Sequence, residues 1–562
     1  MDHLSSKEKK SSGAHYTPTE LAEFVAQRIC NYWKVPDGNS TIRILDPAVG
    51  GGELLCSIFK TIDPNLHDRL NLIGIDNDEV AVTNARKQLS ELDTASSVTA
   101  GDFFDNLTGQ NVDLFKPATT LEPSDIIIAN PPYVRTQVLG AEKAQELAKK
   151  FNLSGRIDLS YPFILGMIEM MKPDGIAGII TSNRFLSTKS GASLREQLSN
   201  SVQILEIWDL GDTRLFEAAV LPCVIVIKKR KPSSSTPTNF VSIYCDQGKK
   251  QWPPDPKELF KSLLNPSCNS LMSCVGDTNY TIKRGSLSKK QNPAEAWVID
   301  NANNRKWLKQ VTSKTWKTVG EISKVKVGVK TTSDKVFIRD DWNEAFPKNT
   351  PEVLKPLITH HLARQYKGAE PSKQILYTHE IVDGVKATIN LKDYPKTKSY
   401  LEANRSKLEE REYVIKAGRE WFEIWVPQDP SAWLKPKIIF KDISIEPTFW
   451  LDESGAVVNG DCYWFSITDD SELKWLLLGV LNSKFIEEFY DHKFSNKLYA
   501  GRRRYMTQYV SQFPIPDPKS SDSKRIIKYA KEIYHDTNKL DDLKSDLNKA
   551  VYKSFGLPIT EK

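Results

Sequence analysis

The chain lacks the features that mark several large classes of protein. Its seven cysteines are scattered over 562 residues and form no C-x-x-C pair, so neither a disulfide framework nor a metal site is expected. No run of about 18 apolar residues exists, so no membrane span is expected. The polar, lysine-rich start lacks the apolar stretch of a signal peptide. We therefore expect a cytoplasmic protein with a short flexible tail at residues 1–13.

The chain also has little excess of charge of one sign, because its 77 basic and 71 acidic residues leave a net charge of only +6. This balance permits a polyanionic partner without arguing for one, so any such argument depends on local clustering. The hydrophobic fraction of 40% is ordinary for a globular protein. A chain of this length is too long for one core, so at least two domains are expected.

The first part of the chain alternates short β-branched runs with helical patterns. Strand–helix alternation with continuous apolar strands predicts an α/β fold, a doubly wound, mostly parallel sheet with helices on both faces. The predicted strands are 41–48, 71–76, 125–130, 175–182, 203–209 and 223–228, and the predicted helices include 18–33 and 158–171.

This pattern ends at a basic stretch rich in proline and serine, residues 228–238, which is typical of a linker or surface loop. We therefore place the first domain at residues 14–238. Beyond it strands are short and tryptophans are frequent, which predicts a second domain of mixed α+β character at residues 239–518. Residues 519–562 have apolar positions at helical spacing and dense charge, which predicts a helix or a helical pair.

A glycine-rich turn follows the first predicted strand and precedes a helical pattern. Glycines there let a ligand approach the backbone closely, although a purely structural tight turn leaves the same pattern. The turn is not G-x-G-x-x-G and no Lys-Ser/Thr follows it, which argues against a dinucleotide site and a phosphate-binding loop. Its candidate binding residues are Asp46, Pro47, Ala48, Gly50 and Gly52.

One acidic residue ends the predicted strand 71–76, and another lies in Gly101-Asp102-Phe103, at the end of the strand that follows it along the chain. Asp76, which Asn77 follows, can accept hydrogen bonds from both hydroxyls of a ribose. Asp102 offers a carboxylate to an adenine amino group, and Phe103 offers an aromatic face. A glycine turn with two acidic strand ends suits a nucleoside ligand that carries no phosphate, so S-adenosylmethionine is the expected cofactor.

The tetrapeptide Asn130-Pro131-Pro132-Tyr133 follows a strongly apolar run. One interpretation is a strand that ends in a proline turn. The other is catalytic, because the Asn130 side-chain oxygen and the Pro131 carbonyl can accept both N–H bonds of an exocyclic amine and direct its lone pair at a methyl donor. Tyr133 supplies a face for a planar base. No general base is required, since positioning and acceptor dipoles carry the rate.

With these motifs in this order, the chain resembles the N-P-P-Y class of amino-methyltransferases, specifically the γ-type N6-adenine DNA methyltransferases of restriction–modification systems. The resemblance spans nearly the whole chain and implies the S-adenosylmethionine-dependent methyltransferase fold, followed by a C-terminal target-recognition domain. The donor turn matches D-P-A-x-G-x-G, with Gly51 where serine is common. The resemblance implies cofactor contacts for that turn and for Tyr16, Thr17, Pro18, Asp76, Asn77, Asp102, Phe103, Asn130 and Phe163.

The resemblance also implies an aromatic partner for Tyr133 at the target base. Phe216 lies in a segment that resembles the loop whose aromatic side chain stacks on an extruded base, and extrusion is needed because the amine is inaccessible inside a duplex. A core position is the alternative for Phe216. Recurrent segments of target-recognition domains are resembled, in the same order, by residues 328–332, 336–338, 436–443, 481–484 and 513–516.

Basic residues and tyrosines gather between Lys484 and Tyr509, where six basic residues face three acidic ones. Such a segment favours contacts with double-stranded DNA, although a solvated basic loop gives the same pattern. The DNA-binding candidates are Lys497, Arg502, Arg503 and Arg504. A second, weaker patch consists of His360, His361, Arg364 and Lys367.

Several other activities stay open as alternatives. Glutamine methyltransferases of translation release factors and some RNA adenine methyltransferases also use N-P-P-Y, but they are typically shorter, whereas more than 300 residues follow the first domain here. Cytosine-N4 methylation shares the chemistry, with serine usual in place of Asn130. A non-enzymatic DNA-binding scaffold predicts decay of the motifs, which are intact. No fused nuclease is expected, and a separate restriction endonuclease is a possible genetic partner. The sequence leaves the recognition site and the oligomeric state open.

Overall fold

The computed structural model describes residues 17–108, 121–133, 141–155, 158–216, 221–232, 236–246, 252–274, 276–287, 292, 295–467, 472–494, 497–498 and 501–558. The predicted tail and Tyr16 lie outside these residues. The chain divides into two compact units. The first comprises Met1–Asn301 with Lys497–Gly501, and the second comprises Ala302–Asn496 with Arg502–Lys562.

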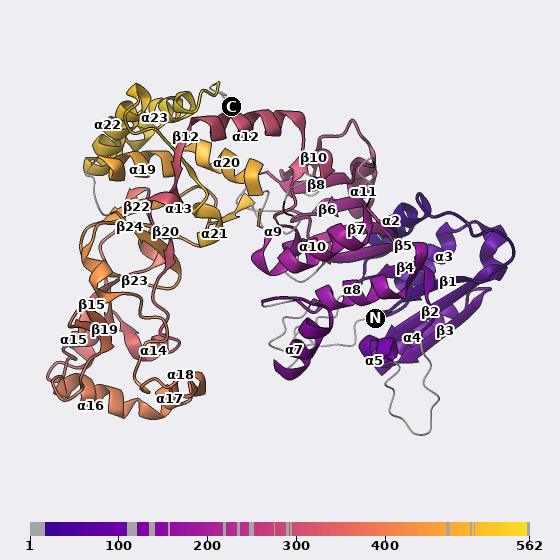
Figure 1. Cartoon of the computed structure of the whole chain (residues 1–562), viewed down its shortest axis with the longest axis horizontal. Coiled ribbons are helices and arrows are strands. Elements are labelled where there is room, and N and C mark those ends of the chain that lie inside the picture. The colour runs from indigo at the N-terminus through magenta and orange to yellow at the C-terminus, as the bar shows by residue number, and fades with distance from the viewer. Residues whose placement is uncertain are drawn as a thin grey trace. The chain divides into compact units, whose positions relative to one another are not determined.

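One large sheet runs through the first unit (Figure 1). Its order is β3-β2-β1-β4-β5-β7-β6-β8-β10-β11, with β9 beside β10. The pairs from β3 to β5 are parallel, β7 is antiparallel to both of its neighbours, and β6 is parallel to β8. The strands are β1 (Ile42–Asp46), β2 (Leu70–Asp76), β3 (Ala95–Ala100), β4 (Ser124–Ala129), β5 (Met171–Ser182), β6 (Gln203–Asp209), β7 (Pro222–Lys228), β8 (Asn239–Cys245), β9 (Ser270–Met272), β10 (Asn279–Leu287) and β11 (Ile299–Asp300).

Burial along the strands follows their sequences. The central strands β4 and β7 are buried over their whole length, as their continuous apolar runs require. The edge strand β3 has the polar sequence ASSVTA and buries only Val98. All six predicted strands are present with ends shifted by a few residues, and the parallel run from β3 to β5 confirms the predicted α/β fold.

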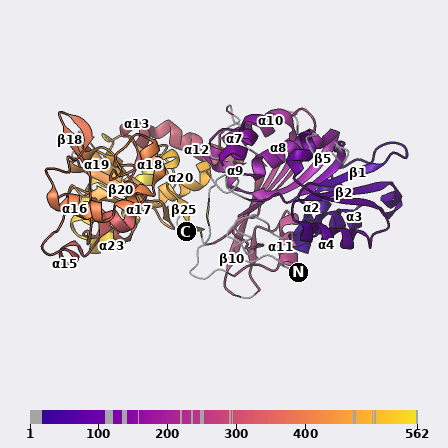
Figure 2. The ribbon, with the colours of Figure 1, turned by 90° about the horizontal axis from the view of Figure 1, so that it is seen from below.

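Helices cover both faces of this sheet (Figure 2). One face carries α2 (Thr19–Cys30), α3 (Glu53–Thr61), α4 (Glu79–Leu89) and α11 (Pro256–Leu264). The other carries α5 (Phe103–Thr108), α7 (Ala141–Lys150), α8 (Ser160–Met170), α9 (Arg184–Ser187) and α10 (Ala192–Ser201). The short 3₁₀ segments of this unit are η1 (Pro64–Arg69) and η2 (Lys189–Gly191).

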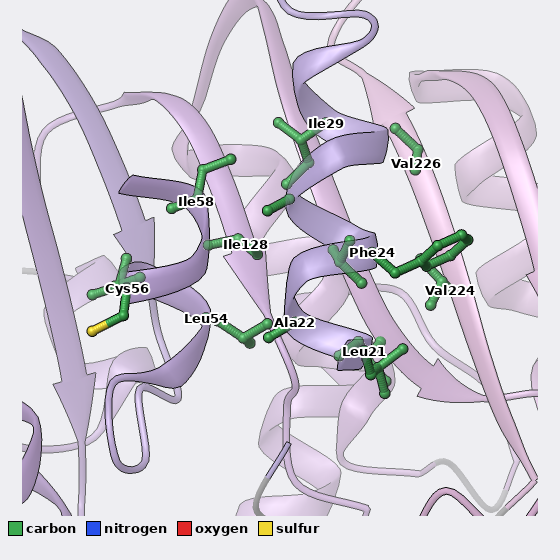
Figure 3. Close-up of a cluster of buried hydrophobic side chains, with 14 of the residues drawn as sticks. Leu21, Ala22, Phe24, Ile29, Leu54, Cys56, Ile58, Ile128, Val224 and Val226 are labelled. Carbon is green, nitrogen blue, oxygen red and sulfur yellow. The ribbon is translucent and has the colours of Figure 1, made fainter. Parts of the chain in front are cut away.

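Helix α2 shows how the sequence selects a covered face. Leu21, Phe24 and Ile29 recur at helical spacing and are buried, so they form one apolar stripe. Figure 3 shows this stripe beside Ile128 of β4 and Val224 of β7. The packing fixes the N-terminal end of α2, at Pro18 and Thr19, relative to the strands.

The first unit extends beyond the boundary expected from the sequence. The basic stretch at residues 228–238 connects β7 to β8 within one sheet and does not link two domains. Because β8 pairs with β6 and β10 pairs with β8, the chain leaves this unit only after Asn301. The placement of the boundary at residue 238 was therefore wrong, since a composition break marked a loop between neighbouring strands.

The second unit is a mixed α+β structure, as predicted. Its larger sheets have the orders β13-β24-β20-β22-β16 and β14-β17-β15-β23, and three further pairs are β12–β26, β18–β19 and β21–β25. The strands are β12 (Thr315–Thr318), β13 (Lys326–Val327), β14 (Ile338–Arg339), β15 (Leu354–Ile358), β16 (Tyr366–Lys367), β17 (Lys373–Leu376), β18 (His379–Val382), β19 (Val385–Thr388), β20 (Lys437–Lys441), β21 (Ile443–Ser444), β22 (Phe449–Asp452), β23 (Val457–Val458), β24 (Cys462–Ser466), β25 (Arg503–Arg504) and β26 (Pro514–Pro516).

The predicted C-terminal helical pair consists of α22 (Ser521–His535) and α23 (Leu540–Ser554), which share a core with α19 (Leu473–Leu481) and α20 (Lys484–Phe494). In the parts of the chain that the structure describes, every helix is too short or too polar to cross a membrane. The other helical segments are α12 (Ala302–Lys314), α13 (Val319–Ile322), α14 (Asp334–Phe337), α15 (Trp342–Ala345), α16 (Pro395–Ala403), α17 (Arg405–Glu409), α18 (Glu412–Lys416), α21 (Thr507–Val510), η3 (His360–Leu362), η4 (Pro430–Leu434) and η6 (Thr537–Lys539).

Candidate active site

The predicted site residues gather at one edge of the first sheet. Asp46 ends β1, Asp76 ends β2, Asp102 follows β3 and Asn130 follows β4. These four strands are parallel neighbours, so their carboxyl ends meet at the same edge, where ligands of open α/β sheets bind.

The glycine turn after β1 is bonded to the end of β2. The Val49 N–H donates to the Ile75 carbonyl at 2.9 Å, and the Gly50 N–H donates to Asp76 Oδ2 at 2.9 Å. Gly50 and Gly52 have φ angles of 51° and 94°, a region that side chains disfavour, so glycine is required at both positions. A Cβ at Gly52 would also lie 3.3 Å from the Ala85 Cα.

Asp46 lies fully buried beneath this turn. Its Oδ1 accepts a hydrogen bond from the Ala48 N–H at 3.0 Å, whereas its Oδ2 has no hydrogen-bond partner among the described residues. Burial, with a smaller contribution from the negative charge of Asp76, raises the pKa of Asp46 to about 8. A buried carboxyl group with one unpartnered oxygen is suited to a cationic ligand.

Asp76 is hydrogen-bonded to two loops, the glycine turn after β1 and the turn that follows β2. Besides the Gly50 N–H, it accepts the Asp78 N–H at Oδ1 over 3.0 Å. Burial raises the pKa of Asp76, although these backbone donors act in the opposite direction. The neighbouring Asn77 is exposed.

Asp102 accepts a hydrogen bond from the Phe104 N–H at 2.9 Å and forms an ion pair with Lys143 of α7. Phe103 is only 1% exposed and stacks on Phe163, with ring centroids 5.4 Å apart and an interplanar angle of 24°. Both rings therefore lie in the core, and the contacts expected between these phenylalanines and the cofactor stay predictions. Asp102 is the more accessible of these groups.

The catalytic tetrapeptide is tied to the segment that precedes α2. The Asn130 Nδ2 donates to Thr17 Oγ1 at 3.1 Å, and the Tyr133 hydroxyl donates to Asn130 Oδ1. Burial, followed by the charges of Asp158 and Cys223, holds the pKa of Tyr133 well above its usual value, so its hydroxyl keeps the proton it donates. These contacts fix the Asn130 amide and point its oxygen towards Tyr133.

A family model described as N-6 DNA Methylase matches residues 1–259, and one described as TaqI-like C-terminal specificity domain matches residues 374–515. The type II methyltransferase M.BanIII of Aneurinibacillus aneurinilyticus is 41% identical over 545 residues, which cover 93% of each chain. The chain belongs to the type II DNA methyltransferases. It is an adenine-specific enzyme, as the resemblance of its motifs implied.

More distant proteins are also similar to the chain. The methyltransferase is 23% identical to M.XhoI of Xanthomonas vasicola, over 98% of both chains. Its fold is similar to that of the type IIL restriction-modification enzyme MmeI, solved in complex with DNA, with a TM-score of 0.62 at 13% identity. That match covers 100% of this chain and 78% of the other.

The methyltransferase also contains a buried polar network that sequence reasoning missed. The Asn183 Nδ2 donates to Asp209 Oδ1 at 3.0 Å and to the Tyr244 hydroxyl at 2.8 Å, and that hydroxyl donates to Asp209 Oδ2 at 2.7 Å. Burial raises the pKa of Asp209 to about 6. Asn183 follows β5 and Asp209 ends β6, so polar residues at the ends of two apolar strands were the available signal.

Phe216 occupies the position that the sequence left as its alternative. Its side chain is 7% exposed and belongs to the core on the α2 face of the sheet. Residues 217–220, which follow Phe216 in the segment that resembles the base-stacking loop, lie outside the described residues. Stacking on an extruded base therefore stays a prediction for Phe216.

Two substitutions distinguish a role of Phe216 in core packing from a role in stacking on the target base. Phe216→Ala should destabilise the protein by about 3 kcal/mol through loss of core packing, whereas Phe216→Leu should cost less than about 1.5 kcal/mol. If Phe216 stacks on the base, the leucine variant should still lose the fluorescence increase of 2-aminopurine placed at the target adenine. An undiminished increase in the leucine variant would assign Phe216 to the core alone.

The basic segment near residue 503 contains one residue that is not available to DNA. Arg503 is 3% exposed, and its guanidinium is bound by Asp491 at 2.8 Å, by Glu487 at 2.9 Å and by the Ile445 carbonyl at 2.8 Å. Its assignment to DNA binding was wrong, because these neighbours already occupy it. Arg504 pairs with Asp442 at 2.8 Å, and Arg502 is exposed.

Arg503→Ala should therefore lower the free energy of unfolding of the protein. Removing one partner leaves Asp491 and Glu487 without their buried counter-charge, which typically costs about 3–5 kcal/mol. Chemical denaturation should show this loss, and Arg502→Ala, at the exposed neighbouring position, should stay within about 0.5 kcal/mol of wild type. Equal stabilities for the two variants would contradict a structural role for Arg503.

Proposed function

We propose that S-adenosylmethionine binds at the edge formed by the ends of β1, β2, β3 and β4, and that Asn130 holds the N6 amine of an extruded adenine beside it. The observation that carries this proposal is the fixed Asn130 amide, whose Nδ2 is bound to Thr17 at 3.1 Å, after a strand paired directly with the strand of Asp46.

The acidic residues at this edge fit the cofactor. S-adenosylmethionine supplies a methyl group on a positively charged sulfur, and its methionine part carries an ammonium group. The unpartnered Oδ2 of Asp46 suits that cationic end, and the side-chain-free Gly50 and Gly52 allow close approach to the backbone. Asp76 would accept the ribose hydroxyls, and Asp102 would accept the adenine amino group.

Asn130 and its neighbours would perform the chemistry on the amine. The Asn130 side-chain oxygen and the Pro131 carbonyl accept the two N–H bonds, which localises the nitrogen lone pair and directs it at the methyl group. Tyr133 stacks on the planar base and keeps the Asn130 oxygen in place through its hydroxyl. The proton leaves to water after transfer, so no side chain needs to act as a base.

Double-stranded DNA is the proposed substrate, and the second unit is the proposed reader of its sequence. The match of residues 374–515 to a specificity domain supports this division. Because the second unit begins at Ala302, the proposed target-recognition domain starts there instead of at residue 239. A separate restriction endonuclease that cuts the same site is the proposed genetic partner.

Label transfer tests the proposed substrate. The full chain is incubated with S-adenosylmethionine labelled in its methyl group and with genomic DNA from a strain that has no adenine methylation. The label should enter material that resists protease and is released by nuclease. Label in protein or in RNA, with none in DNA, would contradict the proposal.

A further inference from the structure

Three basic side chains from distant parts of the sequence converge in the second unit. Lys441 ends β20, at the start of the turn that leads to β22. On one side of this turn, the Gln365 Nε2 donates to the Pro447 carbonyl at 2.8 Å, which places Arg364 next to it. On the other side, the Tyr505 N–H donates to the Asp442 carbonyl at 2.7 Å, and β25 pairs with β21, which brings Arg502 to the turn. Arg364, Lys441 and Arg502 are called the basic triad below.

The basic triad has little local counter-charge. Lys441 is half-buried, and its side-chain amine makes no hydrogen bond or ion pair with the described residues. Of the nearby carboxylates, Asp442 pairs with Arg504 at 2.8 Å, and Asp461 pairs through Oδ2 with His360 at 2.6 Å, while its buried Oδ1 has no hydrogen-bond partner among the described residues.

The surroundings of Lys441 also oppose its positive charge. Burial lowers the pKa of the Lys441 amine, the neighbouring Cys462 acts in the opposite direction, and the positive charges of Arg364 and Arg502 lower the pKa further. The two arginines are exposed, and Arg364 is steadied by the uncharged carbonyl of Ala363 at 2.8 Å. Like charges brought together in this way repel one another, and an anion among them would relieve the repulsion.

We propose that the basic triad binds a phosphate of the DNA backbone. This inference rests on the proposed function, since it names the part of the second unit that holds the substrate. Two guanidinium groups supply planar pairs of donors and the lysine supplies a compact charge, a set suited to a phosphodiester. Phosphate contacts position a duplex without reading its sequence, so the triad sets register while other residues of the unit choose the site.

Salt dependence of binding tests this proposal in the full chain. Binding of a fluorescein-labelled 30-base-pair duplex of arbitrary sequence is measured by anisotropy at several KCl concentrations, for wild type and for R364Q/K441Q/R502Q. The triad neutralises one phosphate, and each lost phosphate contact reduces the slope of log K against log salt by about 0.9, so the triple variant should lose about 0.9 of a unit of slope. Binding at low salt should weaken to the same extent for every duplex sequence.

A matched variant controls for net charge. K524Q/K528Q/K539Q removes three exposed lysines from the C-terminal helical pair and its connection, and its salt slope should equal that of wild type. If the triple variant fails to fold, R502Q alone changes an exposed side chain and should lower the slope by a part of that amount, because two basic side chains remain at the phosphate. Slopes equal to wild type in R502Q and in the folded triple variant would overturn the inference, while methyl transfer by wild type would still support the proposed function. Absence of label in DNA with wild type would overturn the proposed function itself.

Discussion

Asn130→Ala should reduce methyl transfer by about 10²–10³-fold or more, because it removes an acceptor that stabilises charge developing on the amine. Affinity for S-adenosylmethionine should change by less than about threefold, since an interaction made only in the transition state contributes little to ground-state binding. Single-turnover kinetics with labelled cofactor measure the rate, and calorimetry measures the affinity.

Tyr133→Phe provides the matched control for this experiment. It removes the hydroxyl that donates to Asn130 Oδ1 but keeps the aromatic face, so its rate should fall by less than about tenfold. Comparable rates for Asn130→Ala and wild type would remove Asn130 from the catalytic role. A loss of cofactor affinity equal to the loss of rate would assign it to binding.

Asp46→Asn should weaken cofactor binding by about tenfold or more, because a hydrogen bond between charged groups contributes about 1.5–3 kcal/mol.

The same substitution should stabilise the cofactor-free protein at alkaline pH. The folded protein holds a proton on Asp46 up to a pH of about 8, whereas the unfolded chain releases it near pH 4. The contribution of this group to stability is therefore complete below pH 4 and is lost as the pH rises to about 8.

Asparagine does not titrate, so the stability difference between Asp46→Asn and wild type should grow between pH 5 and pH 8. The difference in the pKa of Asp46 between the folded and unfolded states makes this increase in the free energy of unfolding about 3 kcal/mol. Urea unfolding at pH 5, 6.5 and 8 measures it, with Asp37→Asn, at an exposed position, as the control. A constant difference over this range, together with unchanged cofactor affinity, would contradict the account of Asp46.

The sequence predicted the parts of the fold and site that depend on local patterns. Apolar runs identified the strands that carry Asp46, Asp76 and Asn130, because buried parallel strands need continuous hydrophobic residues. Parallel pairing brings the ends of these strands to one edge of the sheet, so the sequence pattern was enough to predict that these residues form one site.

Contacts between distant segments could not be predicted in this way. The bond from Asn130 to Thr17 joins residues 113 positions apart, and the network of Asn183, Asp209 and Tyr244 spans three strand ends. Tertiary packing alone decides that Arg503 is buried against Asp491 while the adjacent Arg502 is exposed. The convergence of Arg364 with Arg502 likewise depends on the pairing of β21 with β25.

The identity of the modified nucleoside tests the central claim most directly. DNA methylated by the purified wild-type enzyme is digested to nucleosides and analysed by mass spectrometry, with Asn130→Ala treated in parallel. The account predicts N6-methyladenine as the new nucleoside with wild type and a background level with the variant. N4-methylcytosine in place of N6-methyladenine, or equal N6-methyladenine from both proteins, would contradict it.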